Sequence, residues 1–348
     1  MTTPLALVTG APGWLGTRFV EVLRAGLPEM PVPDGARRVR CLVSSRASAA
    51  SIADLPEDVE VVTGDVRDPR SLRAFFRDAG GATVFHLCGV ISPRRKRDFF
   101  DVHVRGTRNV LDAAAGAGAR RMIVISSNMV AVPNPQPERL LDEQSPRRPR
   151  LPYGKSKVLM EDAVNEAFEE RRLETVVLRP CRFYGPGQHA ARTRLYRMIR
   201  RGEMLVLGKG DALWSMSYID NTCQALLLAE GSAAAAGRTY WIADRRPYTV
   251  AEITDTVETV LERDFGIPVA HRRRKLPVAA GRIAAAADVV LQRFGFIEKH
   301  LHALGHLQES GACSIAAAER DLGYDPKIEL EEGTRRSIRW CLEKGEPI

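Results

Sequence analysis

The first half of the chain alternates short apolar runs with helix-length amphipathic stretches, and this rhythm constrains its fold more than any other feature. Apolar runs of strand length are typical of parallel strands that are buried on both faces. The predicted strands are Leu5–Val8, Val39–Val43, Val59–Val62, Thr83–Leu87, Met122–Ser126 and Thr175–Leu178, and the predicted helices are Trp14–Arg24, Pro69–Asp78, His103–Ala115 and Tyr153–Glu170. This order predicts βαβ units and an α/β fold with a doubly wound parallel sheet.

A glycine-rich turn joins the first predicted strand to the first predicted helix. It reads Thr9-Gly10-Ala11-Pro12-Gly13-Trp14-Leu15-Gly16, with the spacing GxxGxxG. The first glycine permits a tight turn, the second lets a pyrophosphate approach the backbone, and the third lets the helix pack closely on the strand. Because a helix N-terminus also favours negative charge, we predict a Rossmann-type fold with a dinucleotide at this turn. The predicted contacts are Gly10, Gly13, Trp14, Leu15 and Gly16.

Two later segments extend the predicted cofactor site. Asp65 and Val66 follow the third strand, where a carboxylate can accept from an adenine amino group, whereas Asp68 is predicted to cap a helix. The second strand is followed by Ser44-Ser45-Arg46, with no carboxylate for a ribose hydroxyl and with an arginine for a 2′-phosphate. The sequence therefore favours NADP(H) over NAD(H), and leaves open that Arg46 is only a solvated loop residue.

The rhythm changes near residue 180 to loops, helices and short strands. A chain of 348 residues is long for one domain, since domains average about 150 residues. We predict an NAD(P)-binding domain at 1–180, with segments near 213–245 packing back on it, and a smaller α/β substrate domain at 181–348. The proline-rich segment from Val132 to Pro152 is predicted to be an exposed loop that leads to Tyr153.

Tyr153 and Lys157 are four residues apart, which places them on one helix face, one turn apart. A phenol with a pKa of about 10 is a poor base at neutral pH, but an adjacent ammonium can lower that pKa. Ser127 follows a buried strand, where its hydroxyl can donate to a reacting oxygen. These residues predict acid–base chemistry, although a solvated i, i+4 pair of side chains and a strand-end serine that only satisfies the backbone remain open alternatives.

Taken together, these motifs resemble the extended short-chain dehydrogenase/reductases, the NAD-dependent epimerase/dehydratase family. The motifs that carry the resemblance are Thr9–Gly16, Gly64-Asp65-Val66, His86-Leu87-Cys88-Gly89, Gly106–Leu111, Ser126-Ser127, Tyr153 with Lys157, and Arg179–Gly187. The resemblance implies a catalytic triad of Ser127, Tyr153 and Lys157, with Lys157 also binding the nicotinamide ribose and with Leu87 and Pro180 at the cofactor. His103 is a departure, because relatives usually carry Asn before the Gly-Thr pair.

The second half resembles the branch with 3β-hydroxysteroid dehydrogenases, sterol dehydrogenases and ketoacid reductases. In this reading hydride passes between the nicotinamide and a secondary alcohol or ketone. The segment Trp214–Asn221 lacks the arginine that often grips the diphosphate in nucleotide-sugar enzymes, but a nucleotide-sugar epimerase or dehydratase remains the alternative. A dinucleotide-binding sensor without turnover is a lesser alternative. The candidate substrate contacts are Arg182, His189 and Trp214, and the resemblance implies a homodimer.

Net charge, the spacing of cysteines and histidines, and the length of apolar stretches limit the kinds of partner that we expect. The net charge of +8 comes with basic clusters but without a zinc-finger, RNA-recognition or basic-zipper signature, so we expect a small-molecule substrate and no nucleic acid. The cysteines are widely spaced, and His300, His302 and His306 lack ligand partners, so we predict no metal site. The stretch Pro277–Leu291 is too short to span a membrane and leaves peripheral membrane contact open. With no export signal before the first strand, we expect a cytoplasmic protein.

Overall fold

The computed structural model describes residues 4–28, 30, 37–45, 58–91, 93–188, 190–293 and 310–348. Among these residues, seven parallel strands form the central sheet in the order β11-β6-β5-β4-β1-β2-β3. The strands are β1 (Leu5–Thr9), β2 (Arg38–Val43), β3 (Glu60–Thr63), β4 (Thr83–His86), β5 (Arg121–Ile125), β6 (Glu174–Pro180) and β11 (Arg238–Ile242). The predicted Rossmann-type α/β fold is confirmed.

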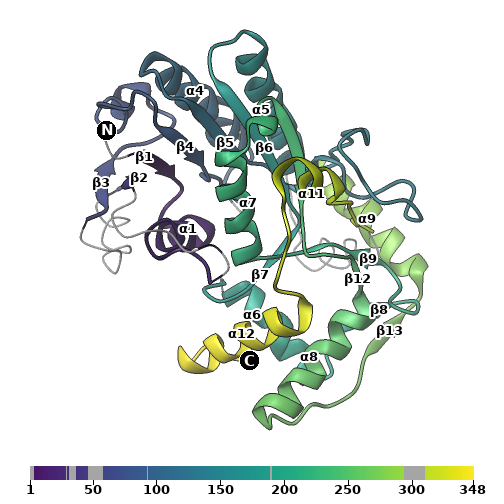
Figure 1. Ribbon diagram of the computed structural model, residues 1–348. Coiled ribbons are helices and arrows are strands. Elements are labelled where there is room, and N and C mark those ends of the chain that lie inside the picture. The colour runs from purple at the N-terminus through teal and green to yellow at the C-terminus, as the bar shows by residue number, and fades with distance from the viewer. Residues whose placement is uncertain are drawn as a thin grey trace.

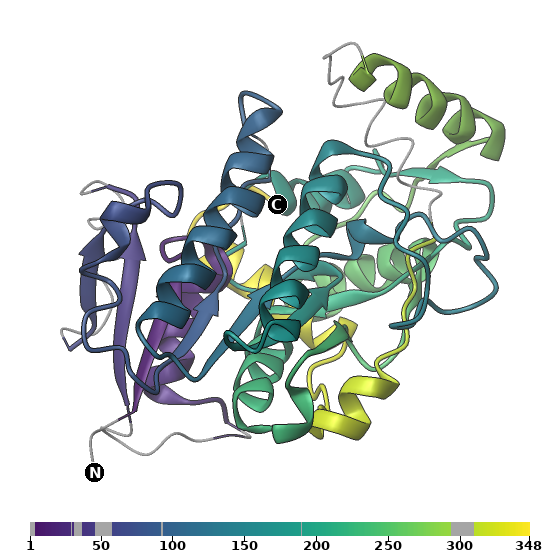
Figure 2. The same cartoon turned by 90° about the horizontal axis from the view of Figure 1, so that it is seen from above.

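Helices cover both faces of this sheet (Figures 1 and 2). One face carries α4 (Thr107–Gly116) and α5 (Pro152–Glu169), and the other carries α1 (Trp14–Ala25), α7 (Ile219–Gly231) and the short α11 (Ala316–Leu322). Two separate apolar cores result, because the strands are buried on both sides. This double cover explains why the strands contain continuous apolar runs.

Two predicted helices were wrong in part. The helix expected at Pro69–Asp78 is only the 3-10 helix η1 (Pro69–Leu72), after which turns lead to Asp78, whose positive φ of 55° ends any helical path. Asp68 caps η1 as predicted, since its side chain accepts from the Arg70 N–H. The helix expected at His103–Ala115 begins instead as α3 (Arg97–Phe100) and a π-helical segment, η2 (Asp101–Gly106), which continues directly into α4.

Segments after residue 180 return to the sheet. Strand β11 adds to the sheet edge beside β6, and α7 lies beside α1. The predicted loop between Val132 and Pro152 has no helix or strand, but it is not wholly exposed. Val132, Leu141 and Leu151 are buried, and Leu141 pairs with Cys313. The loop is therefore anchored at three points by apolar packing.

Most of the remaining elements build a third apolar core beyond the carboxyl ends of the strands (Figure 1). The elements of this core are β7 (Arg182–Tyr184), α6 (Ala190–Arg200), β8 (Leu205–Leu207), β9 (Leu213–Trp214), β10 (Met216–Tyr218), β12 (Tyr248–Thr249), α8 (Val250–Phe265) and α12 (Leu330–Glu343). Outside it lie β13 (Arg274–Leu276), α9 (Val278–Arg293) and the short turns η3 (Asn128–Val130) and η4 (Ala233–Ala235). Short strand pairs join β10 to β7, β12 to β9 and β13 to β8.

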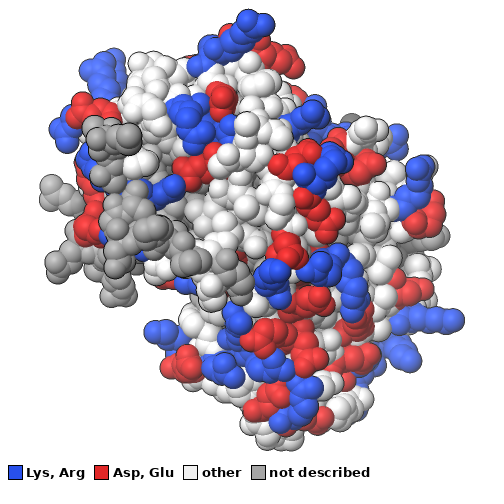
Figure 3. Space-filling view, viewed as in Figure 1, with Lys and Arg blue, Asp and Glu red and all other residues white. Residues whose placement is uncertain are grey.

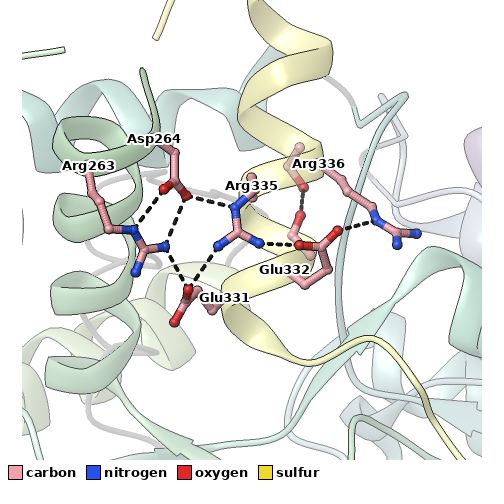
Figure 4. Close-up of polar contacts among 8 residues, drawn as sticks. Arg263, Asp264, Glu331, Glu332, Arg335 and Arg336 are labelled. Carbon is pink, nitrogen blue, oxygen red and sulfur yellow. Dashed lines mark hydrogen bonds and ion pairs between the residues drawn. The ribbon is translucent and has the colours of Figure 1, made fainter. Parts of the chain in front are cut away.

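Charge on the face seen in Figure 3 is mixed, with Lys and Arg side chains interspersed among Asp and Glu. The mixture is dense where α8 meets α12. There Arg263, Asp264, Glu331 and Arg335 form a network of ion pairs between the two helices (Figure 4). The two arginines of this network are thus paired locally with carboxylates. No helix among the described residues is long and apolar enough to cross a membrane.

Candidate active site

The glycine-rich turn is wound too tightly for any side chain at its three glycines. Gly10 has a φ of +92°, and a Cβ there would lie 2.6 Å from the carbonyl carbon of Leu87. A Cβ at Gly13 or Gly16 would lie 2.7 or 2.4 Å from the Gly10 oxygen. The turn therefore has no room for a side chain at these three positions, as expected of a backbone turn that a pyrophosphate approaches closely.

The start of α1 is also electrostatically suited to an anion. Gly13 is its N-cap, no side chain caps the helix, and its first turn has no acidic residue. The positive end of the helix is thus left for a ligand. The Trp14 side chain turns toward the second half of the chain, where its Nε1 donates to the Pro186 oxygen at 2.7 Å and its ring lies 6.0 Å from that of Phe183.

The predicted adenine contact, Asp65, lies in the turn after β3. Its carboxylate accepts from the Arg67 backbone and side chain at 2.6 to 3.1 Å, and these hydrogen bonds hold the pKa of Asp65 below its usual range. Val66 is buried against Gly106, and its carbonyl accepts from Asn109. An adenine amino group at Asp65 would share the carboxylate with Arg67.

The turn that begins at Ser127 packs closely on the first turn of α5. Ser127 is the N-cap of η3, and its Oγ accepts from the Met129 N–H at 3.2 Å. A Cβ at Gly154 would lie only 2.3 Å from the Met129 oxygen. Glycine at position 154 therefore lets the helix that carries Tyr153 and Lys157 pack directly on the turn that begins at Ser127.

Lys157 is buried at 3% exposure, yet it carries an ammonium group. Its Nζ donates to the Ile125 oxygen at 2.9 Å, at the carboxyl end of β5. Burial lowers the pKa of Lys157 to about 8. Tyr153, one turn earlier, is only half-buried, and the rings of Phe99 and His103 lie edge-on to it at 5.7 and 5.6 Å. The structure thus combines a buried cation with a half-buried tyrosine on one helix.

A buried ion pair beneath the site was missed from the sequence. Glu161, one turn after Lys157, binds Arg179 of β6 through two hydrogen bonds of 2.9 and 2.7 Å, and it accepts from Ser126 at 2.6 Å. Glu161 and Arg179 are almost fully buried. Spacing along α5 places Glu161 on the same face as Lys157, but its partner lies on a strand that only the fold brings near. The pair fastens α5 to β5 and β6.

The candidate substrate residues are brought together in part. The guanidinium carbon of Arg182 lies 3.8 Å from the centre of the Trp214 ring, which is a cation–π contact. Cys181 lies next to Arg182, with its Sγ 3.3 Å from that of Cys313, so residues 311–313 also border this region. Leu87 directly follows β4, and Pro180 is the last residue of β6. Both residues therefore lie at the same edge of the sheet. His189, Arg46, His300, His302 and His306 lie outside the described residues.

Comparison with known proteins places these features in a family. The NAD dependent epimerase/dehydratase family matches residues 6–243. The chain is 38% identical to uncharacterized protein y4nL of Sinorhizobium fredii, over 99% of this chain and 97% of that protein. It is 28% identical to a 2-alkyl-3-oxoalkanoate reductase of Stenotrophomonas maltophilia, over 95% of this chain and 97% of the relative.

Two further comparisons agree. The chain is 28% identical to a 3 beta-hydroxysteroid dehydrogenase/Delta 5-->4-isomerase of Mycobacterium tuberculosis, over 98% and 91% of the two chains. Its structure is similar to that of DesIV, a dTDP-glucose 4,6-dehydratase from Streptomyces venezuelae with NAD and TYD bound, with a TM-score of 0.73, 25% identity and 97% coverage of both chains. The chain therefore belongs to the NAD-dependent epimerase/dehydratase family and is an enzyme of the extended short-chain dehydrogenase/reductase type.

Proposed function

We propose that the enzyme transfers a hydride between a nicotinamide dinucleotide and a secondary alcohol or ketone, with Ser127, Tyr153 and Lys157 as its catalytic triad. The observation that carries the proposal is the ammonium of Lys157, buried one helical turn from the half-buried side chain of Tyr153. A buried cation so close favours the phenolate form of the tyrosine, which then exchanges a proton at physiological pH.

The glycine-rich turn, which has no room for a Cβ at its three glycines, and the uncapped N-terminus of α1 support a dinucleotide site here. When bound, NAD(P) supplies or accepts the hydride. Gly10, Gly13, Leu15 and Gly16 would hold the pyrophosphate, Asp65 and Val66 the adenine, and Leu87 and Pro180 would border the nicotinamide. Residues 1–180, with the returning β11 and α7, are thus assigned to the cofactor, and most of residues 181–348 to the substrate.

In the reduction direction Tyr153 donates its phenolic proton to the carbonyl oxygen of the substrate. Ser127 donates a second hydrogen bond to that oxygen and steadies the developing charge. Lys157 stabilises the phenolate that remains, and the Ile125 carbonyl keeps its Nζ in place. The three roles require the three groups to converge on one oxygen at the sheet edge.

We propose a 3-oxo acid or 3β-hydroxysteroid type of substrate, because the reductase and the steroid dehydrogenase are similar to this chain over nearly its whole length. Trp214–Asn221 lacks an arginine for a sugar diphosphate. The second candidate, a nucleotide-sugar epimerase or dehydratase, is favoured by the likeness to the dTDP-glucose dehydratase.

One assay separates the two candidates. The protein is given NADPH or NADH with 3-oxo acids, 3-ketosteroids, or UDP- and dTDP-sugars, and nicotinamide absorbance is followed beside a Tyr153→Phe variant. We expect a ketone to consume cofactor, with NADPH preferred, and the variant to lose this activity. Conversion of a nucleotide sugar without net cofactor consumption would establish the second candidate. We also propose that the protein is cytoplasmic and forms a homodimer. Light scattering tests the dimer, because it measures the mass of the particle in solution.

A further inference from the structure

His103 lies between Tyr153 and the loop that follows β4. Its side chain has 0% exposure, and its ring stands at 80° to the Tyr153 ring. On the other side, a Cβ at Gly89 would lie 3.3 Å from His103 Nε2 and 3.7 Å from Lys157 Nζ. The imidazole therefore borders both residues that the proposed chemistry uses for the proton.

Hydrogen bonds fix which nitrogen of His103 carries the hydrogen. The Val90 N–H donates to Nε2 at 3.0 Å, so Nε2 is the unprotonated nitrogen. Nδ1 must then carry the hydrogen, and it donates to Ser156 Oγ at 2.8 Å. Ser156 in turn donates to the backbone oxygen of Tyr153 at 2.7 Å. Three hydrogen bonds thus run in one direction from the Val90 amide to Tyr153.

The surroundings of His103 favour the neutral ring with its hydrogen on Nδ1. No carboxylate among the described residues is hydrogen-bonded to it, and burial together with the charge of Lys157 lowers the pKa of His103 to about 2. A neutral imidazole has one donor and one acceptor, and both are used here. Protonation would place a second donor against the Val90 N–H.

Tyr153 lies in the first turn of its helix, where such a hydrogen bond has the most effect. It is the second residue of α5, whose N-cap Leu151 offers no side-chain hydrogen bond. A first turn without a side-chain cap frays more readily than the middle of a helix, so the Ser156 bond to the Tyr153 carbonyl adds a constraint there, although it satisfies none of the free N–H groups of the helix end. Catalysis is sensitive to displacement of the reacting group, since an error of about 1 Å can cost roughly a hundredfold in rate.

We infer that His103 is a positioning residue for Tyr153: its Nδ1–H holds Ser156, Ser156 holds the Tyr153 backbone, and the chain of bonds aligns the phenol with Lys157. This inference rests on the proposed triad. The ring does not exchange a proton with substrate. It ties the first turn of α5 to a neighbouring element.

Two substitutions at position 103 separate the two hydrogen bonds of the ring. In His103→Asn the amide nitrogen can take the place of Nδ1, which keeps the bond to Ser156 and gives up the one from Val90. In His103→Gln the amide oxygen can take the place of Nε2, with the reverse result. We expect kcat of His103→Asn to stay within about fivefold of wild type, the effect of one hydrogen bond, and that of His103→Gln to fall about tenfold to a hundredfold.

Ser156→Ala interrupts the same chain of bonds and is expected to lower kcat as His103→Gln does, with the double variant no worse than either single one. The matched control is Ser337→Ala on α12, which also removes a buried hydroxyl bonded to its own helix, at 2.6 Å from the Gly333 oxygen. The control should keep wild-type kcat. A positioning role also predicts an unchanged KM for the cofactor and a larger solvent deuterium isotope effect on kcat, because only the proton step is slowed.

The tautomer of His103 can be measured without an activity assay. Nitrogen NMR of the cofactor-free protein labelled at its seven histidines, with His103→Asn to assign the signal, should show the Nδ1–H form. An Nε2–H form or an imidazolium would overturn the inference. So would wild-type kcat in both His103→Gln and Ser156→Ala while Tyr153→Phe is inactive. If Tyr153→Phe itself kept full activity, the proposed triad would fail, and the tautomer would still be decided by the NMR.

Discussion

Gly154 allows the helix that carries Tyr153 to lie against the turn that carries Ser127. The contact is between backbone atoms, since a Cβ at position 154 would come within 2.3 Å of the Met129 oxygen. Neither the backbone at position 154 nor the Met129 carbonyl can shift without moving α5 or η3. The spacing of the proposed triad is therefore set by the absence of one methyl group.

Gly154→Ala is expected to lower the free energy of unfolding by about 1–3 kcal/mol, the usual cost of overpacking, and to reduce kcat more than tenfold, because Tyr153 is displaced from Ser127. Chemical denaturation and cofactor absorbance measure the two effects. Gly116→Ala is the matched control, since its Cβ would meet nothing within 4 Å at the end of α4. It should be neutral or slightly stabilising, as alanine is the better helix former. Equal effects of the two variants would contradict this account.

Helices α8 and α12 are joined by charged side chains rather than by shape alone. Asp264 accepts from Arg263 and Arg335, each at 2.7 Å, and both arginines also contact Glu331 (Figure 4). The hydrogen bonds from Arg263 and then Arg335 lower the pKa of Asp264 to about 2. A carboxyl with a lowered pKa stabilises the fold while it is ionised, and that contribution disappears as the pH falls.

Asp264→Asn is therefore expected to lower the free energy of unfolding by about 0.5–1 kcal/mol at neutral pH, as for an exposed ion-pair network. The difference from wild type should hold above pH of about 4, where the unfolded carboxyl is still ionised, and vanish toward pH 2. Molar salt should shrink it as well, because exposed charges are screened. A difference that is constant across this pH range would show that the network does not depend on the charge of Asp264.

Elements with a local pattern were predicted, and those with distant partners were not. The strands of the first half and helix α1 follow from apolar runs and from the glycine turn. Asp68 was correctly predicted as a cap because its bond spans two residues. By contrast, the ties of His103 to Val90 and Ser156, and of Glu161 to Arg179, join segments far apart in the chain. Spacing alone carries no information on such contacts, and the π-helical turn around His103 has no sequence period of its own.

Trp14 lies where the glycine-rich turn meets the third apolar core. Its indole joins the glycine-rich turn to the segment that follows β7, through the hydrogen bond to Pro186 and the ring contact with Phe183. Gly187 has a φ of +79° and passes close to the indole, since a Cβ there would lie 3.1 Å from Trp14. The arrangement couples the proposed cofactor turn to the elements that hold Arg182.

Trp14→Phe removes the hydrogen bond but keeps an aromatic ring, so we expect NADPH or NADH binding to weaken about fivefold, the effect of one lost hydrogen bond. Titration of the cofactor by fluorescence or calorimetry measures this change. Trp340→Phe on α12 is the control, because Trp340 packs against the same third core as Trp14 but lies on a different element from the glycine turn. An unchanged dissociation constant for Trp14→Phe would show that the junction does not support the cofactor turn.

The central claim is net hydride transfer to a ketone, and transfer of deuterium from labelled cofactor tests it most directly. Reduced NADP labelled at the reactive nicotinamide carbon is incubated with the enzyme and 3-oxo acids or 3-ketosteroids, and the products are analysed by mass spectrometry. We predict one deuterium at the former carbonyl carbon, in step with cofactor oxidation, and none with Tyr153→Phe. Conversion of a nucleotide sugar with the cofactor unchanged, and no deuterium in any ketone product, would contradict the account.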